Sequence, residues 1–149
     1  ETMPTNMPDA FEAGTLNLPG IIGLNEGVSY IESVGMENIH NHELALTKAF
    51  LEGLRSITGV NIIGKQDIQD RTAVVSITID DMDAASIAYE LESKYHIMTR
   101  VGLHCAPRAH QTLGTYPEGT VRFSFGYANT LEEVDMALSA LHTIVKNTK

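Results

Sequence analysis

The sequence predicts an α+β fold, a two-layer sandwich in which a small, mostly antiparallel sheet carries helices on one face. Two observations predict it. Apolar residues recur at helical spacing in several stretches, and short stretches between them show apolar runs or strict alternation. Their order is two helices, two strands, helix, strand, loop, strand, helix, which lacks the regular strand–helix alternation of a parallel sheet. An extended arm is expected before the first helix.

Composition limits the function classes. The chain has 149 residues, 43% of them hydrophobic, and a formal net charge of −9. This size fits one domain with an arm. The charge argues against a nucleic-acid surface, and there is no apolar run of membrane-spanning length. A single cysteine fits a reducing compartment, and residues 1–9 do not resemble a signal peptide, so a cytoplasmic location is expected. The start at Glu1 suggests a processed protein or a piece of a longer one.

Residues 1–20 hold three prolines and no apolar period, so they are expected to form an extended arm or irregular loop. Such a long arm is expected to pack on a neighbouring domain or subunit. Residues 21–149 are expected to form the α+β domain, including linking helices over 21–58. The first helix runs from Ile21 to Val34 and stops at Gly35. The second has an apolar face from Leu44 to Ile57 and stops at Gly59.

The remaining elements follow in order. Residues 60–63 and 72–79 read as strands that form a hairpin, and residues 96–101 and 120–125 as the third and fourth strands. Asp83 lies among acidic residues that can cap a helix running to about Tyr95. Thr130 and Glu133 form a capping box at the start of the last helix.

Alternation along the fourth strand directs Val121, Phe123 and Phe125 toward the helices and Arg122 toward the open face. If alternate residues of the third strand also face the helices, Arg100 joins Arg122 on that open face. Two arginines on an uncovered face imply a partner, a ligand or an anion. Arg122 alone reads either as a solvated residue or as a bidentate clamp for a carboxylate.

The most informative stretch runs from Arg100 to Pro107 and continues as a loop to Gly119. It contains the only cysteine, Cys105, and the only acid between Arg100 and Arg122 is Glu118. Nearby cations favour the thiolate, the reactive form of cysteine. The alternative is a small buried hydrophobe. A metal site made of His104, Cys105 and His110 matches no compact zinc pattern.

His104 is a candidate to orient or activate the thiol, although adjacent residues of an extended chain point to opposite faces. Arg108 is expected on the surface. Residues 12–17 read either as a turn or as a phosphate contact, in which Gly14 permits close backbone approach and Thr15 offers a hydroxyl and an N–H.

Three segments together carry a resemblance to a family. Phe11–Asn17 followed by Pro19–Ile21, then Arg100–Pro107, then Val121–Ser124 with Asn129–Asp135 resemble class V pyridoxal-phosphate enzymes of the cysteine desulfurase and selenocysteine lyase type. The matches occur in the family's order and span residues 8–141. Ala10 departs from the family, which usually has arginine there.

The resemblance implies the small C-terminal domain of a longer, dimeric enzyme whose N-terminal domain carries the lysine that binds pyridoxal 5'-phosphate. It implies that Cys105 attacks the substrate sulfur or selenium and becomes a persulfide. Arg122 is expected to bind the substrate carboxylate, with Arg100 and His104 as further substrate-binding residues. Gly14 and Thr15 are expected to reach the cofactor phosphate of the neighbouring subunit.

The expected reaction converts cysteine or selenocysteine to alanine, and this piece alone, without the cofactor lysine, is expected to be inactive. A sulfur-acceptor protein is an expected partner of the whole enzyme; nucleic acid, membrane and metal are not. Two alternatives stay open. One is a class V aminotransferase-like enzyme of other specificity, in which Cys105 is incidental. The other is a non-catalytic α+β module that binds a carboxylate or a protein on its open sheet face.

Overall fold

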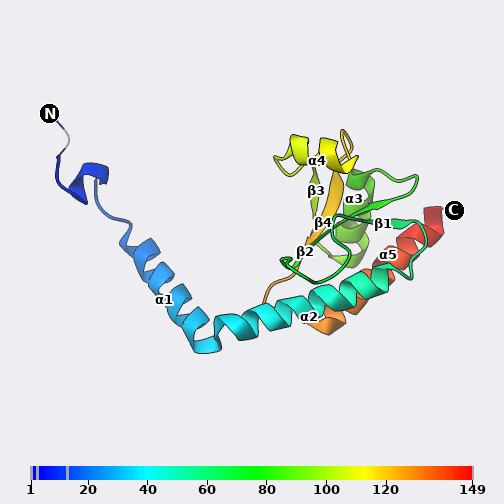
Figure 1. Ribbon diagram of the computed structural model, residues 1–149, viewed down its shortest axis with the longest axis horizontal. Helices are drawn as coiled ribbons and strands as arrows, with labels where there is room; N and C mark the ends of the chain where they lie inside the picture. Colours follow the sequence, from blue (N-terminus) through cyan, green and yellow to red (C-terminus); the bar gives the residue numbers. More distant parts are fainter. Residues whose placement is uncertain (1, 3, 13, 149) are drawn as a thin grey trace. The chain divides into compact units, whose positions relative to one another are not determined.

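The computed structural model describes residues 2, 4–12 and 14–148 (Figure 1). The chain divides into two compact units, Glu1–Asn38 and Ile39–Lys149. Each unit is described by itself below. The boundary expected between an arm and a domain after residue 20 stays a prediction.

The first unit contains a short 3-10 turn, η1 (Asp9–Phe11), and the helix α1 (Leu18–Val34). The first 20 residues are therefore not extended throughout, and α1 begins three residues earlier than expected. Two features explain this start: the Asn17 side chain accepts a hydrogen bond from the Gly20 N–H at 3.1 Å, and Pro19 suits a first helical turn. Gly35, at φ 89°, ends the helix as predicted.

The second unit holds α2 (Met36–Leu54) from Ile39 onward, α3 (Ala84–Tyr95), α4 (Pro107–Leu113) and α5 (Leu131–Thr148). Both predicted caps are confirmed. Asp83 accepts from the Ser86 N–H at 2.9 Å, and the Thr130 hydroxyl and the Glu133 carboxylate each accept the other's N–H. Among the described residues, no helix has the length and apolar character needed to cross a membrane.

The strands β1 (Val60–Ile63), β2 (Val74–Ile79), β3 (Arg100–Gly102) and β4 (Thr120–Ser124) form one sheet in the order β1-β2-β4-β3. All three pairings are antiparallel, which confirms the predicted α+β fold. The expected third strand over 96–101 is too long. His96 adopts the left-handed conformation that closes α3, with its N–H bonded to the Glu92 carbonyl, so strand pairing begins only at Arg100.

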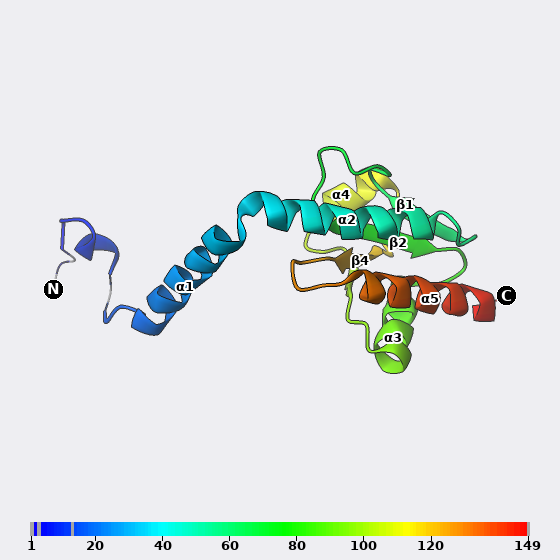
Figure 2. The same ribbon diagram turned by 90° about the horizontal axis from the view of Figure 1, so that it is seen from below.

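One face of the sheet carries the core. Val75 pairs with Phe123 and Ile77 with Val121, and all four are buried with side chains of α2, α3 and α5. The Phe50 ring of α2 lies 4.8 Å from the Phe123 ring. Figure 2 shows α2 and α5 side by side across the sheet. The helices therefore cover one face, as predicted, and the opposite face is left for the site.

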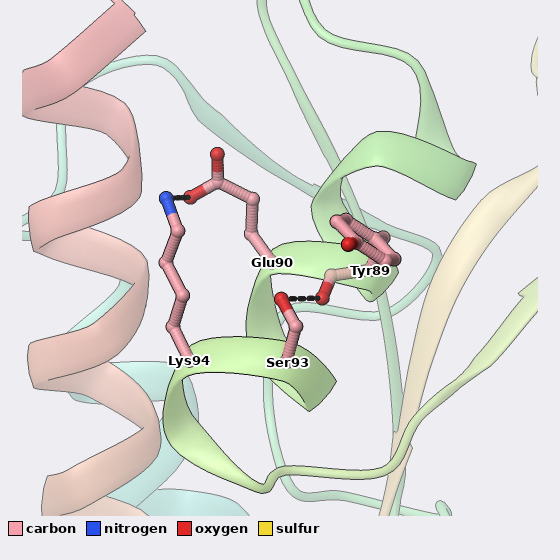
Figure 3. A network of polar contacts seen from close by, with 4 residues as sticks. All are labelled: Tyr89, Glu90, Ser93 and Lys94. Carbon is pink, nitrogen blue, oxygen red and sulfur yellow. Dashed lines mark hydrogen bonds and ion pairs between the residues drawn. The ribbon is translucent and has the colours of Figure 1, made fainter.

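The outward face of α3 is polar and solvated (Figure 3). Lys94 forms an ion pair with Glu90 at 2.9 Å, and the hydrogen bond to that carboxylate, followed by its charge, raises the pKa of Lys94. The Ser93 hydroxyl donates to the Tyr89 carbonyl at 2.6 Å. Exposed pairs of this kind contribute little to stability, so α3 is held by its buried face.

We expect Phe50→Ala to lower the free energy of unfolding by roughly 3–5 kcal/mol, because it leaves a cavity where a fully buried ring packs on Phe123. Tyr89→Ala on exposed α3 surface is the matched control and should change it by less than about 0.5 kcal/mol. Urea unfolding followed by circular dichroism measures both. Equal losses in the two variants would contradict this core assignment.

Candidate active site

The pairing of β3 with β4 places two arginines side by side. Arg100 lies opposite Arg122 in the antiparallel register, and their neighbour Val121 is fully buried on the helix side. Residues directly opposite in a sheet project from the same face. The prediction that Arg100 and Arg122 share the open face is therefore confirmed.

This arginine pair has unmet donors. Within the part of the chain described, the Arg122 Nε is buried without a hydrogen-bond partner, and neither guanidinium forms an ion pair. Like charges opposite one another destabilise a sheet. An anion between them would relieve the repulsion and satisfy the orphaned donor, and a carboxylate matches the planar guanidinium best.

Directly after β3 the chain reverses in a tight turn. The Ala106 N–H donates to the Leu103 carbonyl at 2.8 Å, and the two residues between them, His104 and Cys105, have φ values of 51° and 59°. Positive φ at both central positions is the mirror-image turn that glycine and asparagine favour. A residue with a side chain adopts the left-handed conformation at a cost of about 1–2 kcal/mol, so other contacts must hold this turn.

The stretch up to Gly119 was expected to be a loop, and this is wrong in one respect: it contains α4. The short helix begins at Pro107 and is closed by Gly114 at φ 72°. A proline in the first turn and a glycine just past the end are the ordinary signals of a helix, and the sequence contained both. Arg108, on α4, is exposed as predicted.

The turn presents the thiol. Cys105 is exposed, so the alternative of a small buried hydrophobe is wrong. Its Sγ lies 3.9 Å from Nη2 of Arg100. This contact places a guanidinium cation beside the sulfur. The thiol and the arginine pair thus form one cationic site on the open face.

His104 engages the backbone of the same arginine. Its Nε2 lies 3.1 Å from the Arg100 carbonyl oxygen, and since a carbonyl only accepts, Nε2 carries the hydrogen. Burial lowers the pKa of His104; the bond to Arg100 opposes this shift, while the charges of Arg122, His110 and Arg100 add to it. Among the described residues, no hydrogen bond joins His104 to the thiol.

From the sequence, His110 was considered only as a ligand of an unsupported metal site, and its burial beside His104 was not predicted. The side chain is 5% exposed, its Nδ1 lies 2.7 Å from the Thr115 hydroxyl oxygen, and its ring centroid lies 5.5 Å from that of His104. Among the described residues, no three His, Cys, Asp or Glu side chains are grouped to hold a metal.

The remaining predicted site residues, Gly14 and Thr15, lie in the first unit. Both are exposed in a bend between η1 and α1, and a Cβ at Gly14 would meet no described atom within 4 Å. Their backbone is open to a ligand. Their expected contact with a cofactor phosphate stays a prediction.

Comparisons with known proteins agree with the fold. Residues 1–137 match the family model described as "Aminotransferase class-V". A probable cysteine desulfurase of Pyrococcus abyssi is 37% identical over 96% of this chain and 35% of its own length. A solved apo cysteine desulfurase from Thermococcus onnurineus is 38% identical with a TM-score of 0.87, covering 94% of this chain and 34% of that one. The chain thus spans about a third of the length of these relatives.

A more distant structure supports the fold alone. The cysteine desulfurase CsdA of Escherichia coli superposes with a TM-score of 0.82 at 24% identity, over 94% of this chain and 33% of that chain.

We expect Arg100→Gln to slow alkylation of Cys105 by iodoacetamide at neutral pH, because it removes the cation beside the sulfur. Arg108→Gln, the loss of an exposed arginine nearby, is the control and should alkylate like wild type. Mass spectrometry of the Cys105 peptide over time gives both rates. Unchanged alkylation in Arg100→Gln would show that the cation does not act on the thiol.

We expect the pKa of His104 to lie below the usual 6.5, so that the imidazole is uncharged at neutral pH and protonates only on further acidification. Arg122→Gln removes a nearby positive charge and should move this pKa upward. Titration of the His104 ring protons by NMR measures both. Arg108→Gln, the loss of an exposed arginine that does not act on His104, is the control and should leave the pKa of His104 where it is in wild type.

Proposed function

Since the chain belongs to the aminotransferase class-V family, we propose that it is the C-terminal domain of a pyridoxal-phosphate-dependent cysteine desulfurase or selenocysteine lyase. The reaction converts cysteine or selenocysteine to alanine and leaves sulfur or selenium on Cys105. The observation that carries this proposal is the exposed thiol 3.9 Å from Arg100, whose strand partner is Arg122. The relatives named cysteine desulfurase support it.

The residues of this chain fit a secondary role in binding the cofactor. Gly14 and Thr15 are exposed, and the open space around Gly14 leaves the backbone accessible to a phosphate. The greater part of the cofactor site, including its lysine, would lie in the rest of the enzyme. When bound, pyridoxal phosphate supplies the electron sink that activates the amino-acid substrate.

Arg122 acts first, by binding the substrate carboxylate. Its buried Nε lacks a partner among the described residues, and the neighbouring Arg100 adds positive charge on the same face. A carboxylate would accept charge-assisted hydrogen bonds there and lessen the repulsion between the arginines. Binding of the carboxylate orients the amino acid so that its sulfur faces the turn that carries Cys105.

Cys105 then supplies the nucleophile. Its thiolate attacks the substrate sulfur, a new S–S bond forms, and the C–S bond of the substrate breaks with its electron pair leaving on the carbon skeleton. Protonation of that skeleton gives alanine, and the enzyme retains a Cys105 persulfide. Arg100 donates a hydrogen bond toward the sulfur before the attack, while His104 holds the turn through the Arg100 carbonyl.

The assembly belongs to the same proposal. The enzyme is a cytoplasmic homodimer, and a sulfur-acceptor protein removes the persulfide sulfur from Cys105. The exposure of Cys105 on a tight turn suits such a transfer. Analytical ultracentrifugation of the full-length enzyme tests the dimer.

We expect Cys105→Ala to abolish alanine release from cysteine by the full-length enzyme, because the nucleophile is lost. Cysteine and selenocysteine are assayed in parallel, with pyridoxal phosphate absorbance as the check that the cofactor site is intact. If Cys105→Ala releases alanine at the wild-type rate with both substrates, the cysteine is incidental and the proposed reaction fails.

We expect Arg122→Ala to raise KM for cysteine by about 10- to 100-fold, the size expected when a charge-assisted hydrogen bond is lost. Arg108→Ala is the matched control and should leave KM within about twofold. Steady-state kinetics of alanine formation measures both. A normal KM in Arg122→Ala would remove this residue from substrate binding.

A further inference from the structure

We propose that His110 is a positioning residue for Cys105: its ring, anchored by Thr115, supports the His104 ring and thereby holds the left-handed turn that keeps the thiol beside Arg100. The inference rests on the proposed function and adds to it two residues, His110 and Thr115, to which the resemblance assigns no role.

The turn needs such a support. His104 and Cys105 are consecutive residues with side chains in the left-handed conformation, which persists only where surrounding structure enforces it. The backbone bond from Ala106 to Leu103 closes the turn, yet the same bond would close a turn of ordinary hand. A contact other than this backbone hydrogen bond must therefore favour the left-handed form of the turn.

The contacts of the His104 ring can favour the left-handed form of the turn. It reaches back to the Arg100 carbonyl at 3.1 Å and packs against the His110 ring at a centroid distance of 5.5 Å and an interplanar angle of 57°. The hydrogen bond fixes the turn to β3, and the contact between the rings packs the turn against α4. If the His110 ring shifts, the His104 ring loses the surface against which it is aligned.

His110 is itself firmly held. It is buried, and Thr115 meets it twice: the hydroxyl oxygen lies 2.7 Å from Nδ1, and the Thr115 N–H donates to the His110 carbonyl at 2.9 Å. The Thr115 carbonyl accepts from the Gly119 N–H at 2.7 Å. Gly119 in turn lies so close to the Gly102 backbone that a Cβ there would overlap it. The whole segment from Gly102 to Gly119 is therefore closed on itself around His110 and Thr115.

A role in packing alone predicts something different. A histidine kept only to fill space could be replaced by an aromatic ring of similar size, and the Thr115 hydroxyl would be dispensable for the chemistry. A positioning role requires the 2.7 Å contact itself, because that contact sets where the ring lies. The two roles predict different rates for the attack of the Cys105 thiolate on the substrate sulfur. Substrate binding by Arg122 is expected to be the same in both.

The experiment uses the full-length enzyme with pyridoxal phosphate bound and compares Thr115→Val, Thr115→Ser and His110→Phe. Thr112→Val is the matched control, because Thr112 is an exposed α4 threonine whose hydroxyl only bonds the Arg108 carbonyl of its own helix. Single-turnover persulfide formation, kcat and KM for cysteine, and alkylation of Cys105 by iodoacetamide are measured, with cofactor absorbance and thermal midpoint as folding checks.

We expect Thr115→Val and His110→Phe to slow persulfide formation by about 10- to 100-fold, the range for a catalytic group displaced by about 1 Å. KM should stay within about twofold, the alkylation rate of Cys105 should change in the same variants, and Thr115→Ser should restore both rates. Thr112→Val should behave as wild type. If His110→Phe fails to fold, the comparison of Thr115→Val with Thr115→Ser decides.

Wild-type persulfide formation in folded Thr115→Val, or a loss that Thr115→Ser does not rescue, would overturn the inference. Its failure is distinguishable from that of the proposed function. If Cys105→Ala is inactive while Thr115→Val is normal, only the positioning role fails; if Cys105→Ala still releases alanine, the proposed function fails first.

Discussion

The antiparallel pairing of β3 with β4 is the constraint on which the site depends. It sets Arg100 opposite Arg122, and it ends at Gly102, so that the turn carrying Cys105 starts within reach of the Arg100 side chain. β4 is held by Val121 and Phe123 in the core. The cationic face therefore rests on a strand anchored in the core, although β3 itself is a three-residue edge strand.

The pairing also carries an electrostatic cost that a bound anion would offset. Two arginines lie opposite each other on neighbouring strands in a chain of net charge −9. Carboxylates are plentiful in the sequence, yet among the described residues neither arginine has one as an ion-pair partner. Neutralising the pair internally would stabilise the sheet but would occupy the donors that an external anion could bind. Among the described residues, the unpartnered Nε of Arg122 and the repulsion between the two arginines are the features that a bound anion would satisfy.

Sequence patterns predicted the parts of this arrangement that depend on local periodicity. Alternation along β4 was enough to orient Arg122, and side-chain spacing was enough to find the caps at Asp83 and Thr130. The start of β3 and the helix α4 were missed, because His96 closes α3 in a left-handed conformation and the Pro107 and Gly114 signals were read as loop. The bond between His110 and Thr115 spans the end of α4, and it forms only once that segment has closed.

Neighbouring residues on an extended chain point to opposite faces. The left-handed turn nevertheless allows His104 and Cys105 to contact the same residue. Because both residues are left-handed, the chain reverses its direction, and both side chains lie near Arg100. His104 binds the Arg100 carbonyl, whereas the Cys105 sulfur lies near the Arg100 guanidinium. The Arg100 backbone is thus fixed by His104, the neighbour of Cys105, while the Arg100 side chain lies near the Cys105 sulfur. Any force that moves the turn must change both contacts, which couples the position of the thiol to that of the Arg100 side chain.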